Sequence, residues 1–119
     1  TTAQDLSGGN RDGTYQGTMT HSASSACRVD GGGSTTFNGT NTAVYTPTAF
    51  ASPQVFSIEV WFRTSSTAGG KLVGFESQQT GGGQYDRHIY LTANGRLAFG
   101  LYNSTYYTAI TTGAYNNGA

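Results

Sequence analysis

The ten residues VFSIEVWFRT at positions 55–64 decide the fold class of this sequence. Phe56, Ile58, Val60 and Phe62 are apolar, and each is separated from the next by one residue of another kind. A period of two places all four on one face of an extended chain, whereas a helix would need a period of 3.6. The β-branched and aromatic residues also favour a strand. We therefore predict a strand over residues 55–64 whose apolar face supplies much of the core.

Composition extends this prediction to the whole chain. Gly, Thr, Ser and Asn make up 55 of the 119 residues, and all four are poor helix formers. The 15 aromatic residues argue against a disordered, low-complexity chain. A surface poor in Lys and Glu but rich in Thr, Ser and Asn is typical of secreted proteins. We expect one all-β domain over residues 1–119, in a secreted or extracellular protein.

Charge and cysteine content exclude several classes of partner and linkage. Six basic residues balance six acidic ones, which argues against nucleic acid or an anionic membrane as the main partner. No apolar run approaches the ~20 residues that a membrane-spanning helix needs. Cys27 is the single cysteine, so no disulfide can form within these residues. It is interpreted as a small buried hydrophobe or as the partner of a cysteine on another segment or chain.

Turn signals divide the rest of the sequence into short strands. We predict them at residues 14–20, 34–37, 43–45, 71–76, 85–91, 96–102 and 106–112. The Asn38-Gly39 turn joins the second to the third, and Asn94-Gly95 lies at the tip of the strongest hairpin, between the fifth and the sixth. Short strands with turns every 8–12 residues or so describe an antiparallel β-sandwich.

Four stretches together resemble a known family. FSIEVWFRT (56–64), GGKLVGFES (69–77) and YDRHIYLTANGRLAFGLYN (85–103) follow one another as in the laminin-G-like (LamG) domains of the concanavalin A-like lectin/glucanase superfamily. DLSGGNRDGTYQG (5–17) is similar to the entry turn of that family. The YDRHIY variant is similar to LamG modules of secreted multidomain bacterial proteins.

The resemblance implies a jelly-roll of two antiparallel sheets, truncated at both ends. LamG domains begin with an apolar strand before the entry turn, and they continue into further strands after a turn like that of residues 116–118. On this expectation the chain lacks its first strand and its C-terminal strands. A sandwich without them exposes unpaired edges, so we expect either that the chain is a fragment or that a second chain or a swapped copy completes it.

The sequence offers no catalytic constellation. Glucanases of the superfamily use closely spaced carboxylates on one strand, but the strand predicted at 55–64 carries Glu59 alone. Glu76 is the only other glutamate, and no Ser-His-Asp set or phosphate-binding loop is present. We predict that the chain is not an enzyme.

A candidate calcium site lies in the N-terminal turn. Related domains often bind calcium at the rim of the sandwich, and this ion takes six to eight oxygen ligands. Asp5, Asn10 and Asp12 bring three oxygen-bearing side chains into one turn that is rich in glycine. The alternative is an Asx turn, in which Asp5 accepts a hydrogen bond from the backbone two residues later.

Two groups of side chains are candidates for ligand binding. Sugar sites pair aromatic platforms with planar polar groups, because a pyranose has an apolar face and a rim of hydroxyls. One group lies beside the glycine loop 81–83, and the other lies at the turn that follows. The candidates are Tyr85, Asp86, Arg87 and His88 in the first group and Tyr102 and Tyr106 in the second. Structural alternatives are an Asp86–Arg87 pair, packing of His88 with Tyr90, and a Trp61 that covers a second layer instead of lining a groove.

We therefore expect a non-catalytic extracellular recognition module for a glycan or a glycosylated surface, with calcium as a possible aid. The rival hypothesis is an assembly role, in which another chain or a swapped copy in a homo-oligomer pairs with open sheet edges. A third option is an accessory part of a glycoside hydrolase whose catalytic residues lie on other segments.

Overall fold

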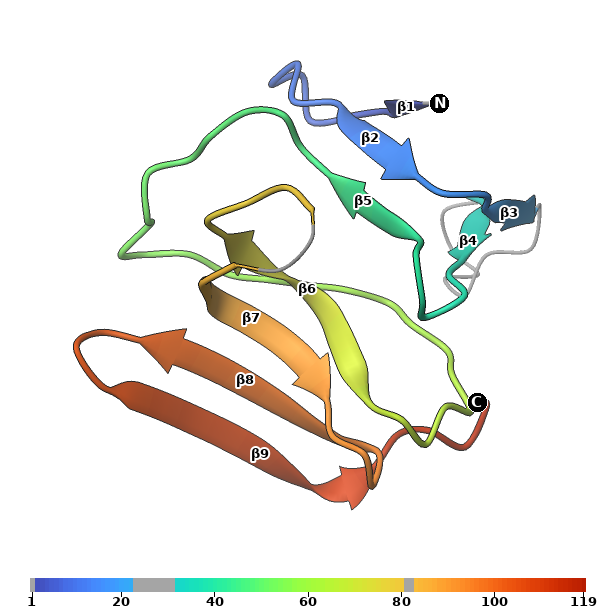
Figure 1. Ribbon diagram of the computed structural model, residues 1–119, viewed down its shortest axis with the longest axis vertical. Coiled ribbons are helices and arrows are strands. Elements are labelled where there is room, and N and C mark those ends of the chain that lie inside the picture. The colour runs from blue at the N-terminus through green and yellow to red at the C-terminus, as the bar shows by residue number, and fades with distance from the viewer. Residues whose placement is uncertain (1, 23–31, 81–82) are drawn as a thin grey trace. The chain divides into compact units, whose positions relative to one another are not determined.

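The computed structural model describes residues 2–22, 32–80 and 83–119, and these residues form strands and turns without any helix (Figure 1). All the strand pairs that they form are antiparallel. The predicted all-β, antiparallel class is confirmed, and the arrangement is consistent with a β-sandwich. Cys27 and two residues of the loop 81–83 lie outside the described residues.

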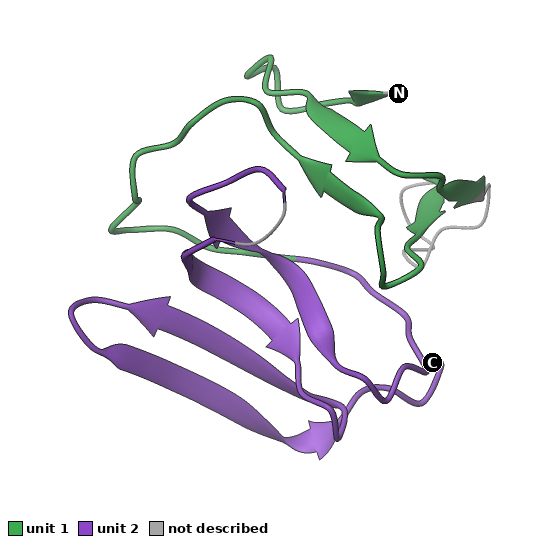
Figure 2. Ribbon diagram, viewed as in Figure 1, with its two compact units in different colours: residues 1–59 green, residues 60–119 purple. Residues whose placement is uncertain are grey.

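The chain divides into two compact units, Thr1–Glu59 and Val60–Ala119 (Figure 2). The first holds a sheet in the order β1-β2-β5 and a separate pair, β3-β4. Their bounds are β1 (Thr2–Ala3), β2 (Gly13–Gln16), β3 (Thr20–Ser22), β4 (Ser34–Thr36) and β5 (Ala43–Tyr45).

The single strand predicted at residues 14–20 is wrong, because the chain changes direction at Gly17 and forms two strands, β2 and β3. The φ of Gly17 is 78°, in the left-handed region that glycine adopts without strain. A Cβ at this position would lie 2.6 Å from the backbone oxygen of Asn41. The sequence pattern showed polar strand residues on both sides of Gly17 but not this change of direction.

The Asn38-Gly39 turn joins two strands that belong to different sheets, so the expected turn does not form a hairpin. β4 pairs with β3, whereas β5 pairs with β2. The Asn38 side-chain oxygen accepts hydrogen bonds from the N–H groups of Thr40 and Asn41, at 2.9 and 3.1 Å. These local bonds stabilise a wider loop in place of a two-residue turn.

The second unit contains one four-stranded sheet in the order β6-β7-β8-β9. The strands are β6 (Gly70–Glu76), β7 (Tyr85–Leu91), β8 (Arg96–Tyr102) and β9 (Tyr106–Ala114). The predicted β7–β8 hairpin is confirmed: Gly95 donates its N–H to the oxygen of Thr92 at 2.9 Å, with φ 79° at Gly95. The best-buried apolar side chains, Leu91 and Ala98, lie on these two central strands.

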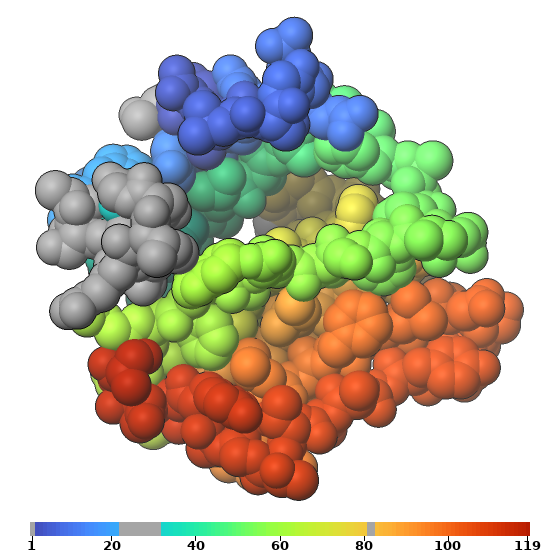
Figure 3. Space-filling model, turned by 180° about the vertical axis from the view of Figure 1, so that it is seen from behind, coloured from blue at the N-terminus to red at the C-terminus, as the bar shows by residue number. Residues whose placement is uncertain are grey.

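The predicted strand at residues 55–64 is not formed, and this is the main correction. The segment pairs with no strand among the described residues, although Phe56, Ile58 and Phe62 are half-buried between exposed neighbours. The period of two therefore predicted the burial of three of the four apolar residues, whereas Val60 is exposed. A strand also needs the backbone of a neighbour, which side-chain periodicity does not reveal. Trp61 is 59% exposed. Atoms of this green to yellow-green segment lie on the face seen in Figure 3.

Candidate functional site

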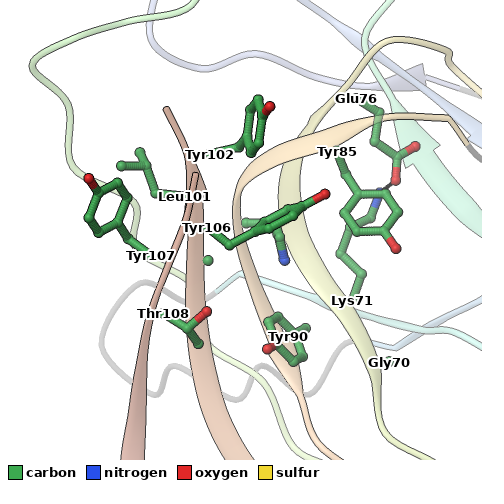
Figure 4. A pocket seen from close by; sticks show the side chains of 12 residues that line it. Gly70, Lys71, Glu76, Tyr85, Tyr90, Leu101, Tyr102, Tyr106, Tyr107 and Thr108 are labelled. Atoms are coloured by element: carbon green, nitrogen blue, oxygen red, sulfur yellow. Dashed lines mark hydrogen bonds and ion pairs between the residues drawn. The ribbon is translucent and has the colours of Figure 1, made fainter. Parts of the chain in front are cut away.

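A cavity of about 580 Å³ opens on one face of the β6–β9 sheet, within the second unit. We call it the tyrosine pocket. It is lined by Gly70, Lys71, Glu76, Tyr85, His88, Tyr90, Gly100, Leu101, Tyr102, Tyr106, Tyr107 and Thr108. Figure 4 shows the ring of Tyr106 lying across the pocket toward Tyr85, while Leu101 and Tyr107 point to the other side of their strands.

Strand register brings these side chains to one face. His88 pairs with Gly100, and Tyr90 pairs with Ala98, so these residues share a face of the sheet. Tyr102 pairs with Tyr106 across the β8–β9 turn. His88 and Tyr90 therefore lie on the face opposite Ile89 and Leu91.

An irregular residue on β7 adds Tyr85 to this face. Tyr85 and His88 are three residues apart and would point to opposite sides of a regular strand. Arg87 between them has a φ of 46°, which changes the alternation. As a result the rings of Tyr85 and His88 meet edge to face, with their centroids 5.2 Å apart.

The aromatic rings form two adjoining groups that remain open to solvent. On β7, the His88 ring also lies 5.1 Å from that of Tyr90, and at the next turn the rings of Tyr102 and Tyr106 are 5.0 Å apart. Tyr106 is 80% exposed, and Tyr85 and Tyr102 are about half exposed. Their phenolic hydroxyls make no hydrogen bond with any residue that the structure describes, so they are free to bond a ligand.

His88 lies in a slot between two glycines of the neighbouring strands. A Cβ on Gly74 would come within 2.4 Å of the His88 Cβ, and one on Gly100 would lie 2.8 Å from the imidazole. The His88 Nδ1 is buried and has no hydrogen-bond partner in the described part of the chain. Burial, and next the positive charge of Lys71, lower the pKa of His88, so the neutral imidazole is favoured.

Lys71 and Glu76 form an ion pair at the edge of the pocket (Figure 4). Burial lowers the pKa of the Lys71 ammonium, while the adjacent carboxylate favours its charged form. Lys71 is paired in register with Tyr90, and Glu76 is paired with Tyr85, so both ends of β6 reach the pocket.

Sequence reasoning missed this ion pair for a specific reason. Lys71 and Glu76 are five residues apart, and a regular strand would place them on opposite faces. The β6–β7 register shifts between Lys71 and Val73 and again between Val73 and Phe75. The sequence signal that could have predicted the pair is the position of Lys71 and Glu76, which have opposite charges and flank one apolar strand.

Four of the six candidate ligand residues, Tyr85, His88, Tyr102 and Tyr106, line the pocket, whereas Asp86 and Arg87 do not. Asp86 and Arg87 form an ion pair, as the structural alternative predicted, and Arg87 is only 7% exposed. The Asp86 Oδ1 also accepts the backbone N–H of Tyr102 at 2.7 Å. This bond ties the end of β8 to β7 and so fixes the backbone position of Tyr102. A direct ligand contact by Asp86 or Arg87 stays a prediction.

The N-terminal turn has the hydrogen bonds of an Asx turn. Asp5 Oδ1 accepts the N–H of Ser7 at 2.8 Å, and its Oδ2 accepts the N–H of Arg11 at 2.9 Å. The Ser7 hydroxyl also donates to Asp5 Oδ1. This bond contributes most to lowering the pKa of Asp5, and the two backbone bonds add to it. Asp12 Oδ1 accepts the N–H of Asp5 at 2.8 Å.

These contacts favour the turn interpretation over the calcium one. The two oxygens of Asp5 accept backbone N–H groups of the turn itself. Asn10, with φ 51°, occupies the left-handed conformation common for Asn in turns. Calcium binding by Asp5, Asn10 and Asp12 stays a prediction.

Comparisons with models of protein families, with curated proteins and with solved structures found no match. Within the described residues, no helix is long and apolar enough to cross a membrane. The geometry of the tyrosine pocket is therefore the main evidence for function.

Proposed function

We propose that this chain is a non-catalytic extracellular recognition module that binds carbohydrate in the tyrosine pocket. The observation that carries the proposal is the set of exposed rings, Tyr85, Tyr102 and Tyr106, around one cavity. A secreted setting is supported by the composition and by the resemblance to LamG domains. A glycan, either free or on a glycosylated surface, is the partner with the matching chemistry.

The ring faces and the hydroxyls of the pocket serve different parts of a sugar. The apolar face of a pyranose packs against an aromatic ring, because both are flat and lose little conformational entropy on contact. Phenolic hydroxyls both donate and accept hydrogen bonds, as sugar hydroxyls do. Exposed tyrosines whose hydroxyls make no hydrogen bond with a described residue are therefore suited to a polyhydroxylated ligand.

The same site lacks the arrangement for hydrolysis. Retaining and inverting glycosidases place two carboxyl groups about 5 to 9.5 Å apart around the scissile bond. Among the described residues that line the pocket, Glu76 is the only one with a carboxylate, and it is paired with Lys71. This supports binding without catalysis.

Calorimetric titration of the purified chain with a panel of oligosaccharides tests the proposal. We expect Tyr106→Ala to weaken binding at least about tenfold, the loss of roughly 1.4 kcal/mol. Tyr115→Ala is the matched control, because Tyr115 is an exposed tyrosine of the same unit that does not line the pocket. Equal affinities of the wild type and Tyr106→Ala would contradict the proposal.

An assembly role is the second candidate, and the edge strand β9 favours it. β9 pairs with β8 on one side only among the described strands, and its nine residues YYTAITTGA carry no charge and no proline. Charged residues and proline are the residues that usually prevent an edge strand from pairing with another chain. If β9 accepts a strand of a second copy, Ile110→Pro should remove a concentration-dependent dimer measured by analytical ultracentrifugation, because Ile110 is paired with Ala98 and turns its N–H away from β8. A monomer at all concentrations would contradict this role.

A further inference from the structure

We propose, building on the proposed function, that the tyrosine pocket selects neutral glycans over glycans that carry carboxylate or sulfate groups. The inference concerns the charge of the ligand, which the aromatic rings alone leave open. It follows from the way the charged side chains of the pocket are already paired.

The pocket holds one cation and one anion, and they neutralise each other. Of the described residues that line it, only Lys71 and Glu76 carry a full charge, and they form an ion pair. The next cation along β7, Arg87, is buried and paired with Asp86. An anionic sugar would therefore find no uncompensated positive charge in the pocket.

His88 does not supply the missing charge. Its ring occupies the slot between Gly74 and Gly100, where its Nδ1 is buried. Protonation there would place a second positive charge near Lys71, and the buried Nδ1 would have no partner for its proton among the described residues. The imidazole is thus available as a neutral group.

The Lys71–Glu76 pair can bind a hydroxyl without breaking. A sugar hydroxyl can accept from the Lys71 ammonium and donate to the Glu76 carboxylate at the same time. A carboxylate or sulfate can only accept, so it would compete with Glu76 for the Lys71 ammonium and be repelled by the Glu76 carboxylate. Glu76 is 20% exposed, and losing its partner would leave a largely desolvated charge.

The test compares neutral with acidic oligosaccharides by calorimetry on the wild-type chain. The neutral set is gluco-, xylo-, manno- and galacto-oligosaccharides, and the acidic set is oligogalacturonates and heparin fragments of similar length. We expect the best neutral ligand to bind at least about tenfold more tightly than any acidic one, with little dependence on salt.

The outcomes separate the two proposals. An acidic ligand that binds more tightly than every neutral one, and weakens as salt rises, would overturn the charge selection but leave carbohydrate binding intact. If neither the neutral nor the acidic oligosaccharides bind, the proposed function itself is overturned.

Glu76→Gln tests the mechanism of selection directly. Removing the carboxylate frees Lys71, so the ratio of acidic to neutral affinity should rise at least about tenfold. Glu59→Gln makes the same change of charge at the only other glutamate, which is exposed and does not line the pocket, and should leave the ratio unchanged. An unchanged ratio in folded Glu76→Gln, with folding checked by circular dichroism, would overturn the inference.

Discussion

His88 packs between Gly74 and Gly100, and a side chain added at these two positions would meet different parts of His88. At Gly74 an added Cβ would come within 2.8 Å of the His88 Cα, which is backbone. At Gly100 it would meet the far end of the imidazole, which can rotate away. The two positions therefore separate damage to the sheet from damage to the pocket.

Gly74→Ala should lower the free energy of unfolding by about 1–3 kcal/mol or more, because overpacking forces two strands apart. Gly100→Ala should cost less stability but displace the His88 ring and weaken glycan binding. Urea denaturation and calorimetry measure the two effects. Gly113→Ala is the control, since its added Cβ would have only ordinary contacts, at 3.8 Å or more.

An equal loss of stability in Gly74→Ala and Gly113→Ala would contradict the packing of His88 described above.

The lowered pKa of His88 predicts a pH dependence of stability. The unfolded chain gains a proton on this imidazole more readily than the folded chain, so stability falls as pH decreases below about 6.5. Urea denaturation between about pH 5 and 8 measures the slope, at pH values above the range where Asp5 titrates. His88→Gln should flatten this slope, whereas His21→Gln, which keeps His88, should retain it.

A slope that is the same in the wild type and in His88→Gln would contradict the assignment to His88.

At the scale of elements, strands that lie next to each other in sequence were predictable and distant pairings were not. The β7–β8 hairpin is predicted by the Asn94-Gly95 turn and by the alternating residues on either side of it. Its two strands have the predicted bounds. Residues 55–64 and the Asn38-Gly39 loop are the opposite case. Their local patterns are clear, but whether and with what a strand pairs depends on segments far along the chain.

Two features require glycine at position 95: the left-handed turn conformation and the close packing of Asn116. An added Cβ would lie 2.0 Å from the Asn116 side-chain oxygen, and Asn116 donates to the Ser66 oxygen at 3.0 Å. Gly95→Ala should therefore cost the ~1–2 kcal/mol of a left-handed alanine plus the loss of this contact. Gly118→Ala, with φ 78° and open space around its Cβ, should cost the conformational part alone.

Thermal and urea unfolding of both variants gives the difference. Equal destabilisation by Gly95→Ala and Gly118→Ala would show that Asn116 does not brace the turn.

At the scale of the molecule, the class of fold and part of the pocket lining could be predicted, and the electrostatics of the pocket could not. His88, Tyr102 and Tyr106 share one face through strand alternation and hairpin register, which are readable in sequence. The irregular Arg87 and the register shifts of β6 are not readable in that way. They bring Tyr85, Lys71 and Glu76 to the same face, and so they set the charge balance that the selection of neutral glycans depends on.

Nuclear magnetic resonance of the isotope-labelled chain, titrated with a neutral oligosaccharide that binds it, tests the central claim most directly. We predict that the largest shifts fall on the side chains of Tyr85, Tyr102 and Tyr106 and on the backbone of β6 and β7 beside them. Shifts of the same size confined to residues 1–59, with the three tyrosines unchanged, would contradict a carbohydrate site in the tyrosine pocket.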